Sequence, residues 1–357
     1  MARTRWIELA MGRRGKIASI GIALAMLLMG LMGCSESDKP KAGRAAYYWK
    51  TVLRWEKADS VNAASLGLST LYIRYFDVAL VDNKILPVAP VQNLGVAPQG
   101  LRIVPVVYMT LEALEAISDS SASVELATHI VKMVTRLHRP IGKPFDELQI
   151  DCDWTASSRD RYFRLLHQIK KQTPARLSVT IRLHQVKFVR KTGFPPVDKG
   201  MLMVYNMGHP GKTDGRNSII DAALVESYVK NLRAYPLPLD YAFPLFSWAA
   251  LFRGDKLTGL LRDKTEEELE ECPALKKTGD HAWTAMRSGR LGNVRLWRGD
   301  RIRFDASGVD EVLGAARKVH EKATLHPGTL VSVFSWDSLQ IERFGKGNIG
   351  RIYEEFE

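Results

Sequence analysis

The chain has 357 residues, of which 46% are hydrophobic and 9% aromatic, with 51 Lys and Arg against 39 Asp and Glu and three cysteines. This is the composition of a folded globular protein, and it excludes a disordered, collagen-like or disulfide-stapled chain. Part of the net charge of +12 lies in the first 33 residues. The rest favours anionic surfaces or polymers without singling out nucleic acid, and no nucleic-acid partner is expected.

The amino terminus has the pattern of an export signal. No residue from 17 to 33 is charged, basic residues precede this run, and small residues close it before Cys34. A basic segment, a short apolar segment and small residues before a cut are typical of a signal peptide, here residues 1–33. The alternative is an uncleaved anchor helix, because seventeen residues are at the lower limit for crossing ~30 Å of hydrocarbon. Translation could begin at Met1 or at Met11.

The Leu-x-Gly-Cys sequence that ends at Cys34 resembles the bacterial lipobox. The resemblance implies cleavage before Cys34 and acylation of this cysteine, palmitate included, which would tether the protein to a membrane through its lipid. Residues 34–44 are small, charged and proline-containing, as in a solvated linker. We therefore expect a lipoprotein of the bacterial cell envelope, most simply on the outer membrane, with its folded domain at residues 45–357.

Eight short runs rich in β-branched and aromatic residues follow one another through this domain. Several are almost continuously apolar, as expected for parallel strands that helices cover on the outside. The runs lie at residues 45–52, 69–78, 101–109, 147–154, 176–184, 201–207, 239–248 and 329–337.

Helical periodicity appears between the strand signals. Apolar residues repeat at helical spacing over 124–137, a helix with one apolar face follows Ser158, and 217–232 and 307–323 predict two more helices. Eight strands in βα order over about 300 residues predict a single-domain (β/α)8 TIM-type barrel. A doubly wound open sheet is the alternative, but no glycine-rich phosphate-binding turn follows the first strand.

One segment between the seventh and eighth strands, residues 281–308, departs from the repeat. Residues 294–297 and 301–304 alternate around Gly299-Asp300, which predicts a β-hairpin inserted into the barrel. Its arginines could contact an anionic polymer or lipid headgroups, or they could simply form the solvated face of a small sheet. They are Arg287, Arg290, Arg295, Arg298, Arg301 and Arg303.

Polar and aromatic residues gather where the predicted strands end. In a (β/α)8 barrel these carboxyl ends form one rim, which carries the functional groups. Aromatic faces stack on sugar rings, while carboxylates and amides bind hydroxyl groups, so this set predicts a carbohydrate site. The strand-end residues are Asp77, Glu112, Asp151, Asp153, Arg182, His184, Tyr205, Asn206, Trp248, Trp336 and Asp337.

The fourth strand carries the strongest of these signals. Asp151 and Asp153 are two residues apart and therefore point to the same side of the strand. Two carboxylates that face a barrel interior repel each other and lose solvation, which raises the pKa of one of them. Such a pair requires a proton, a cation or hydrogen-bond donors. The alternative is a structural pair, with one Asp capping the next helix and the other held by Arg182.

Three short motifs resemble the family 18 glycoside hydrolases, the chitinase-like barrels. Residues 150–154 (Ile-Asp-Cys-Asp-Trp) resemble that family's fourth-strand signature, Asp-x-Asp-x-Glu. Residues 203–206 (Met-Val-Tyr-Asn) are similar to its sixth-strand motif, and residues 334–336 (Phe-Ser-Trp) stand where the family has its eighth-strand tryptophan. The resemblance implies a (β/α)8 barrel with a sugar site floored by Trp336.

The same resemblance implies a changed catalytic centre. Asp153 stands where the family's Asp orients the substrate, but Thr155 stands where its catalytic Glu protonates the glycosidic oxygen. A threonine hydroxyl cannot act as a general acid near neutral pH. The domain also resembles a group of bacterial lipoproteins without an assigned activity, in residues 47–51, 71–77 and 149–155.

We therefore expect a lipid-anchored envelope protein that binds a glycan at the barrel rim through Asp151, Asp153, Tyr205, Asn206 and Trp336, with Asp77, Arg182 and Trp248 around them. One alternative is an active glycoside hydrolase that uses Asp153 with Glu112 or Asp77. Another is a non-catalytic scaffold that docks through the arginine-rich insertion. No zinc-ligand spacing or nucleotide-binding loop is present, so neither a metal nor a cofactor is expected. The sequence does not indicate an oligomeric state.

Overall fold

The computed structural model describes residues 40–212, 216–262 and 264–357. Residues 41–357 form one compact unit, which contains every described helix and strand and both hydrophobic cores. This unit is therefore equipped to fold on its own. The predicted signal segment, Cys34 and most of the linker lie outside the described residues. No helix within the described ranges is both long and apolar enough to cross a membrane.

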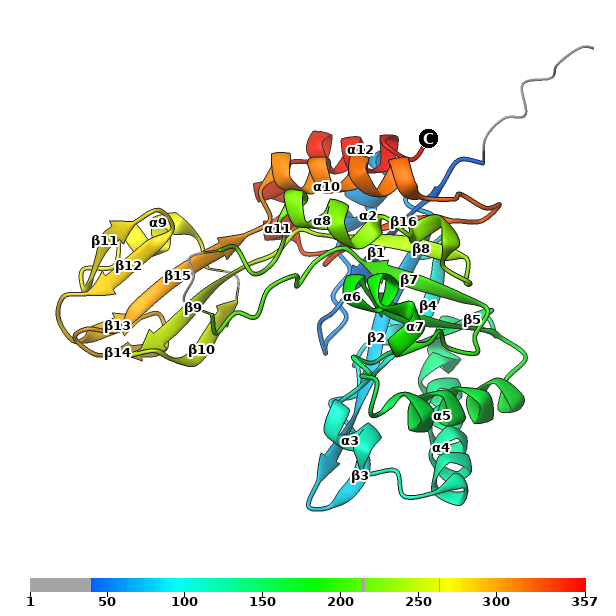
Figure 1. Ribbon diagram of the computed structural model, residues 1–357. Coiled ribbons are helices and arrows are strands. Elements are labelled where there is room, and N and C mark those ends of the chain that lie inside the picture. Colours follow the sequence, from blue (N-terminus) through cyan, green and yellow to red (C-terminus); the bar gives the residue numbers. More distant parts are fainter. Residues whose placement is uncertain (1–39, 213–215, 263) are drawn as a thin grey trace, which may run out of the picture. The chain divides into compact units, whose positions relative to one another are not determined.

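Eight parallel strands close into a barrel, which confirms the predicted fold class (Figure 1). The first strand closes it by pairing on both sides, with Ala45 opposite Thr70 and Gly43 opposite Leu330. Each strand overlaps one of the eight runs expected from the sequence. In barrel order the strands are β1 (Gly43–Tyr48), β2 (Thr70–Val81), β4 (Arg102–Met109), β5 (Glu147–Asp151), β6 (Arg176–Arg182), β7 (Lys199–Met203), β8 (Leu239–Pro244) and β16 (Leu330–Phe334).

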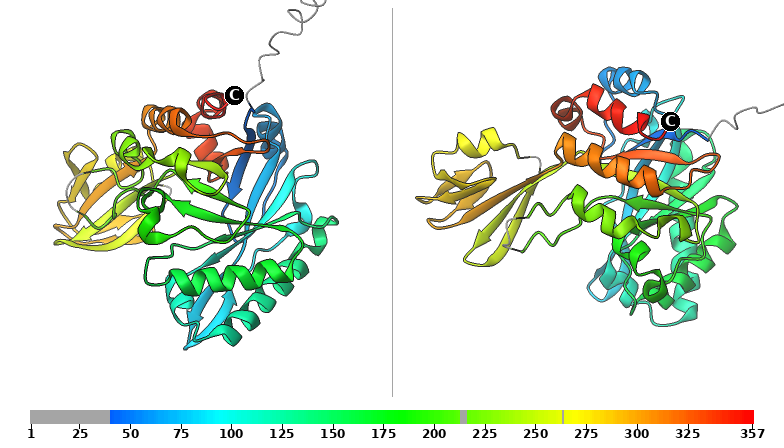
Figure 2. Two further views of the ribbon diagram at one scale, coloured as in Figure 1. Left: turned by 45° about the vertical axis from the view of Figure 1, so that its right-hand side comes forward. Right: turned by 45° about the horizontal axis from the view of Figure 1, so that its top comes forward.

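Helices surround the strands on the outside (Figure 2). Each buries an apolar face, and the longer ones begin at residues that suit a helix start: Asp119 accepts a hydrogen bond from the amide of Ala122, and Asp221 from that of Leu224. The four predicted helices are present as α4, α5, α8 and α10. The helices of the barrel are α2 (Lys57–Ser65), α3 (Leu111–Glu115), α4 (Ser120–His138), α5 (Arg159–Gln172), α6 (Leu183–Lys187), α7 (Val189–Thr192), α8 (Ala222–Val229), α10 (Val309–Lys322), α11 (Ser338–Phe344) and α12 (Lys346–Glu354).

Side chains fill the middle of the barrel. Tyr47 and Tyr72 stack on each other with ring centroids 4.8 Å apart, and the Tyr47 hydroxyl donates to Oε1 of Gln149 at 2.6 Å. All three residues are buried. The barrel is therefore a packed core, as is usual for this fold, and a ligand has access only at its ends.

The insertion between the seventh and eighth barrel strands is present, and it is larger than residues 281–308. A five-stranded antiparallel sheet and a two-stranded ribbon form it, with a small core of their own around Trp283. Its elements are β9 (Ser247–Arg253), β10 (Lys256–Arg262), α9 (Glu266–Glu270), β11 (Leu275–Gly279), β12 (Ala282–Ala285), β13 (Gly289–Leu291), β14 (Val294–Leu296) and β15 (Arg301–Ala306).

The pairing inside the insertion corrects the expected hairpin. The two arms around Gly299-Asp300 do not pair with each other: β14 pairs with β13, while β15 lies between β9 and β12. Asp300 is buried and accepts hydrogen bonds from the amide of Trp297 and the guanidinium of Arg253. These bonds hold the connection between β14 and β15 in place. β15 is then part of the five-stranded sheet, between β9 and β12.

Candidate functional site

The carboxyl ends of β5, β6 and β7 bring an acid, a base and an aromatic residue together. Arg182, the last residue of β6, forms a two-pronged ion pair with Asp153, which follows β5; one prong, Nη2 to Oδ2, measures 3.1 Å. The Asp153 side chain is 55% exposed and that of Arg182 only 16%. The guanidinium also lies 5.9 Å from the ring centroid of Tyr205. The Asp153 carboxylate is therefore exposed to solvent, while the less exposed guanidinium of Arg182 lies beneath it and holds it in place.

Arg182 keeps one unused donor. Its Nη1 is buried and makes no hydrogen bond within the described part of the chain. Buried donors are nearly always paired, so this nitrogen departs from the usual pattern. The sequence identified Arg182 as a strand-end residue. It could not show that Nη1 has no partner, because this depends on the neighbouring residues from β5 and β7.

Asp151 lies below this ion pair, inside the barrel. It is buried, and the Thr180 hydroxyl donates to its Oδ1 at 2.6 Å. Burial raises the pKa of Asp151, and repulsion from Asp153 adds to the shift although Arg182 opposes it. The two acids are thus in different environments: Asp153 is exposed and paired with a cation, whereas Asp151 is buried and its pKa is raised.

A cavity of about 210 Å³ opens above Asp153 and Arg182. Asn206, with φ of +54°, and the exposed His184 stand on its wall. Burial lowers the pKa of His184, so its ring is neutral near pH 7 and offers both a donor and an acceptor. The lining residues are Asp153, Arg182, Leu183, His184, Tyr205, Asn206, Met207 and Tyr228.

Half-buried aromatic rings continue from this cavity across the barrel end. Phe334, the last residue of β16, lies 5.3 Å from the ring of Tyr205 and 5.3 Å from that of Trp49, and Phe246 lies 5.9 Å from Phe334. Trp49, Phe246 and Phe334 were not among the predicted site residues. Each lies inside a run that was predicted as a strand, but at or just beyond the end of the observed strand.

Two tryptophans that were predicted to stack on a sugar are buried elsewhere. Trp336 is 1% exposed, stacks on Trp55 and donates from Nε1 to Asp59 at 2.9 Å. Trp248 is 9% exposed and donates to Asp305 at the base of the insertion. Neither ring lines the cavity. The chitinase-like motif and the expected strand end suggested the placement of Trp336, but β16 ends at Phe334 and Trp336 lies beyond it.

Two further candidate acids also lie away from the cavity. Asp77 forms a two-pronged ion pair with Arg74 on its own strand, and Glu112 is exposed in the first turn of α3. Neither is among the residues that line the cavity. Within the described ranges, no group of three or more His, Cys, Asp or Glu side chains is arranged to hold a metal ion.

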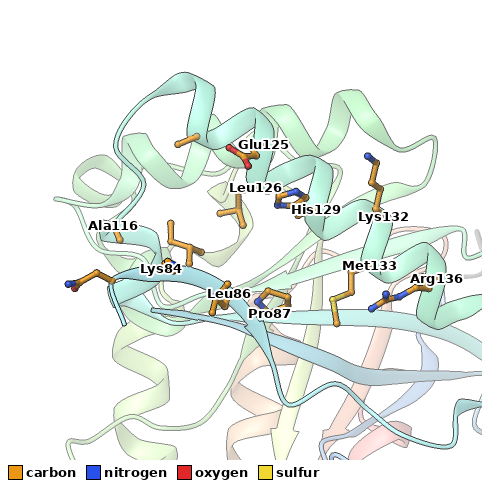
Figure 3. Close-up of a pocket in the computed structure, with 13 residues that line it drawn as sticks. Lys84, Leu86, Pro87, Ala116, Glu125, Leu126, His129, Lys132, Met133 and Arg136 are labelled. Carbon is orange, nitrogen blue, oxygen red and sulfur yellow. The ribbon is translucent and has the colours of Figure 1, made fainter. Parts of the chain in front are cut away.

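The largest hollow lies outside the barrel end. It measures about 780 Å³ and runs between α4 and β3 (Lys84–Val88), the strand that pairs antiparallel with the end of β2 (Figure 3). Leu86, Leu126 and Met133 line it together with basic side chains, and Glu125 is its one carboxylate. The hollow is larger, but it lacks the Asp153–Arg182 ion pair of the smaller cavity, so the smaller cavity is the better candidate for binding chemistry.

Comparison with solved structures places this fold among chitinase-like barrels. The spore cortex-lytic enzyme SleL of Bacillus cereus matches 88% of this chain and 75% of its own at 13% identity, with a TM-score of 0.53. A chitinase of Chromobacterium violaceum matches 86% and 98% at 12% identity (TM-score 0.53), and the GH18 chitinase ChiB of Flavobacterium johnsoniae 89% and 94% at 11% (TM-score 0.52).

These identities establish the fold alone. No family model matches the sequence, and no curated protein is significantly similar to it. The chain is therefore a closed (β/α)8 barrel with the architecture of GH18 chitinase-like proteins and an added antiparallel β insertion.

Proposed function

We propose that this protein binds a carbohydrate at the barrel end without cleaving it. The observation that carries the proposal is the Asp153–Arg182 ion pair at the base of an open cavity. A carboxylate and a guanidinium side by side bind adjacent hydroxyl groups in complementary ways, one accepting and the other donating. The half-buried ring of Phe334, 5.3 Å from that of Tyr205, supplies the apolar surface on which a sugar face stacks.

The size of the cavity limits the ligand that it holds. About 210 Å³ lies below the ~300–1,000 Å³ of pockets that enclose drug-sized ligands. The cavity therefore suits one sugar residue, such as the end of a chain, while further residues would contact the aromatic rings beyond it. We expect an oligosaccharide to bind with its terminal unit against Arg182.

The proposal excludes hydrolysis because the cavity lacks a pair of carboxyl groups: Asp153 is the one carboxylate among its lining residues. Thr155, which stands where chitinase-like barrels have their Glu, shares a hydrogen bond of 2.8 Å with Ser157, and a hydroxyl is too weak an acid to protonate a leaving group. Asp153 is paired with Arg182. Burial raises the pKa of Asp151, but Asp151 does not line the cavity. The placement of Asp77 and Glu112 gives no support to either as its partner.

The test is a glycan array on residues 41–357, with chitin fragments and cell-wall glycans included, followed by product analysis of each bound glycan. Asp153→Asn should weaken binding about 10- to 100-fold, since a hydrogen bond to a charged group contributes about 1.5–3 kcal/mol. Asp146→Asn is the matched control: Asp146 is 59% exposed and pairs with an arginine at the other end of the barrel. Cleavage products, or equal losses in both variants, would contradict the proposal.

We further propose that the protein is anchored to the cell envelope through a lipid on Cys34. The lipobox-like sequence supports this, and two acyl chains give a stable anchor at about 0.8 kcal/mol per buried methylene. Cys34→Ala should convert a membrane-associated protein into a soluble one or an uncleaved precursor, as shown by membrane fractionation and mass spectrometry of the amino terminus. Unchanged membrane association of a cleaved Cys34→Ala protein would contradict lipidation.

A further inference from the structure

The insertion carries a cluster of cations that the carbohydrate site does not use. We call it the arginine patch and define it as Met286, Arg287, Arg290, Arg295, Trp297 and Arg298. All six side chains are exposed, and they lie on or beside β13 and β14, which form a two-stranded ribbon of their own (Figure 1). The neighbouring Arg253 and Arg301 are different, because each pairs with a carboxylate, Asp300 and Asp255 respectively.

The patch arginines have no such partner. Within the described structure none of the four forms an ion pair; Arg287 and Arg290 donate only to backbone carbonyls, at 3.2 and 3.1 Å. Arg290 also stands directly opposite Arg295 in the β13–β14 register. Like charges at directly opposed positions of an antiparallel pair destabilise it. A ribbon of three residues per strand thus places two cations together without compensation, which favours an anionic ligand on that face.

Exposed apolar groups lie among these cations. Trp297 is 43% exposed and Met286 55%. The guanidinium of Arg295 lies 4.2 Å from the indole centroid and that of Arg253 lies 5.7 Å from it. Because the guanidinium of Arg295 lies over the Trp297 indole, less of the indole face is free to stack on a sugar or a base. The exposed part of the indole remains accessible. A soluble polyanion requires charge only, whereas cations mixed with an exposed indole and thioether match a lipid–water interface.

We propose that the arginine patch docks on the surface of a bilayer that contains anionic phospholipids. Arg287, Arg290, Arg295 and Arg298 contact the phosphate groups, and Trp297 and Met286 enter the headgroup layer between them. The docking is electrostatic and reversible, because each basic side chain near an anionic surface contributes only about 1 kcal/mol. It requires neither Cys34 nor its lipid, and it adds a second, independent contact with a membrane.

Residues 41–357, which lack Cys34, test the proposal in co-sedimentation with vesicles. The protein should bind vesicles of phosphatidylcholine and phosphatidylglycerol in equal amounts, should release in high salt, and should not bind phosphatidylcholine alone. The double variant Arg290→Gln/Arg295→Gln should bind about 30-fold more weakly, the equivalent of about 1 kcal/mol for each arginine. Its fold is checked by thermal melting.

The matched control is Lys132→Gln/Arg136→Gln on α4, which removes two exposed cations that likewise form no ion pair among the described residues. This control should bind anionic vesicles like the wild type. Trp297→Gln keeps every charge and should still weaken binding several-fold, because the indole no longer enters the interface. Equal losses in the patch variant and the control would overturn the proposal. So would binding to soluble polyphosphate, lost in the patch variant, without binding to vesicles; the occupant would then be a polyanion.

Discussion

The barrel encloses two sets of charged side chains, one at each end, and they differ in how completely they are paired. At the end where the strands begin, Glu147 is fully buried and contacts two cations: Nη2 of Arg102 at 2.7 Å and Nζ of Lys199 at 3.3 Å. Ser178 donates to its other oxygen at 2.6 Å. Lys199 also pairs with the buried Asp240. Each of these groups contacts an opposite charge, although burial still raises the pKa of Asp240.

At the end where the strands finish, the matching is incomplete. Asp153 and Arg182 pair with each other, but Nη1 of Arg182 has no partner among the described residues, and Asp151 lies unpaired beneath them with its pKa raised by burial. Burial would also raise the pKa of Glu147, but Lys199, Ser178 and Arg102 outweigh it and lower that pKa. The pKa values of Glu147 and Asp151, which lie four residues apart on β5, are therefore shifted in opposite directions.

We interpret the set around Glu147 as structural and the set around Asp153 and Arg182 as functional. A buried ionised group is tolerated when cations and donors compensate it, and such a network contributes to folding only while it is whole. An incomplete set is destabilising by itself, and this one lies next to the cavity that we propose as the ligand site. Six substitutions and one pH dependence test this division, beginning with the largest effect.

Removing the charge of Glu147 should break the complete set. Glu147→Gln leaves Arg102 and Lys199 partly uncompensated, and losing one partner of a buried ion pair costs about 3–5 kcal/mol. Urea unfolding should show this loss, with an unchanged dependence on denaturant. Asp146→Asn is the control, because Asp146 pairs with the same Arg102 but is 59% exposed; it should cost less than about 1 kcal/mol. Equal costs would mean that burial does not distinguish these carboxylates.

The acid dependence of stability should arise from the same network. The pKa of Glu147 is lowered in the folded state, so its contribution is present above the ordinary carboxyl pKa and is lost as the pH falls through the folded value. Wild-type protein should therefore lose stability below about pH 4 more steeply than Glu147→Gln. Parallel curves would argue against the ion pairs as its source.

A substitution of Trp336 should show whether this tryptophan has a structural or a sugar-binding role. Its buried ring stacks on Trp55 and donates to Asp59. Trp336→Phe should cost about 2 kcal/mol by leaving a cavity and removing this hydrogen bond, and it should leave glycan affinity unchanged. Trp297→Phe, at a 43% exposed site, should change stability by less than about 0.5 kcal/mol. A large loss of glycan affinity in Trp336→Phe would return Trp336 to the site.

The sequence predicted the barrel because parallel strands covered by helices are nearly continuously apolar. The run 101–109 contains β4, and the run 201–207 overlaps β7 at residues 201–203. The insertion was less predictable. Its strands are as short as three residues, and a Gly-Asp pair indicates a turn without indicating which strands it joins; β14 and β15 pair with other neighbours.

The candidate site was predictable in part for the same reason. Asp153, Arg182, Tyr205 and Asn206 stand at or just beyond strand ends, and parallel strands in a closed barrel bring such residues to one rim; all four line the cavity. Trp248 and Glu112 also come after barrel strands, but their connecting segments differ, because Trp248 enters the insertion and Glu112 a short helix. Nearness to a strand end selects candidates, whereas the direction of the connecting segment decides which of them meet.

Asp151 should respond in the opposite sense to Glu147. Its pKa is raised in the folded state, so any stability linked to its protonation is present below the ordinary carboxyl pKa and is lost as the pH rises through the folded value. Asp151→Asn removes this loss while keeping an acceptor for Thr180. The variant should be more stable than the wild type by about 1 kcal/mol at neutral pH and equal to it in acid, as measured by thermal melting at both pH values. A destabilised variant at neutral pH would show that Asp151 belongs to a complete network after all.

The smallest effect is expected at Glu112, which separates binding from catalysis. Its side chain is exposed in α3 and does not line the cavity, so Glu112→Gln should change stability by less than about 0.5 kcal/mol and leave glycan affinity as it is. If Asp153 worked with Glu112 as an acid–base pair, the same substitution would abolish turnover of a bound glycan while preserving its binding. Measuring affinity and product formation on one glycan therefore distinguishes a binding barrel from a hydrolase whose acid comes from α3.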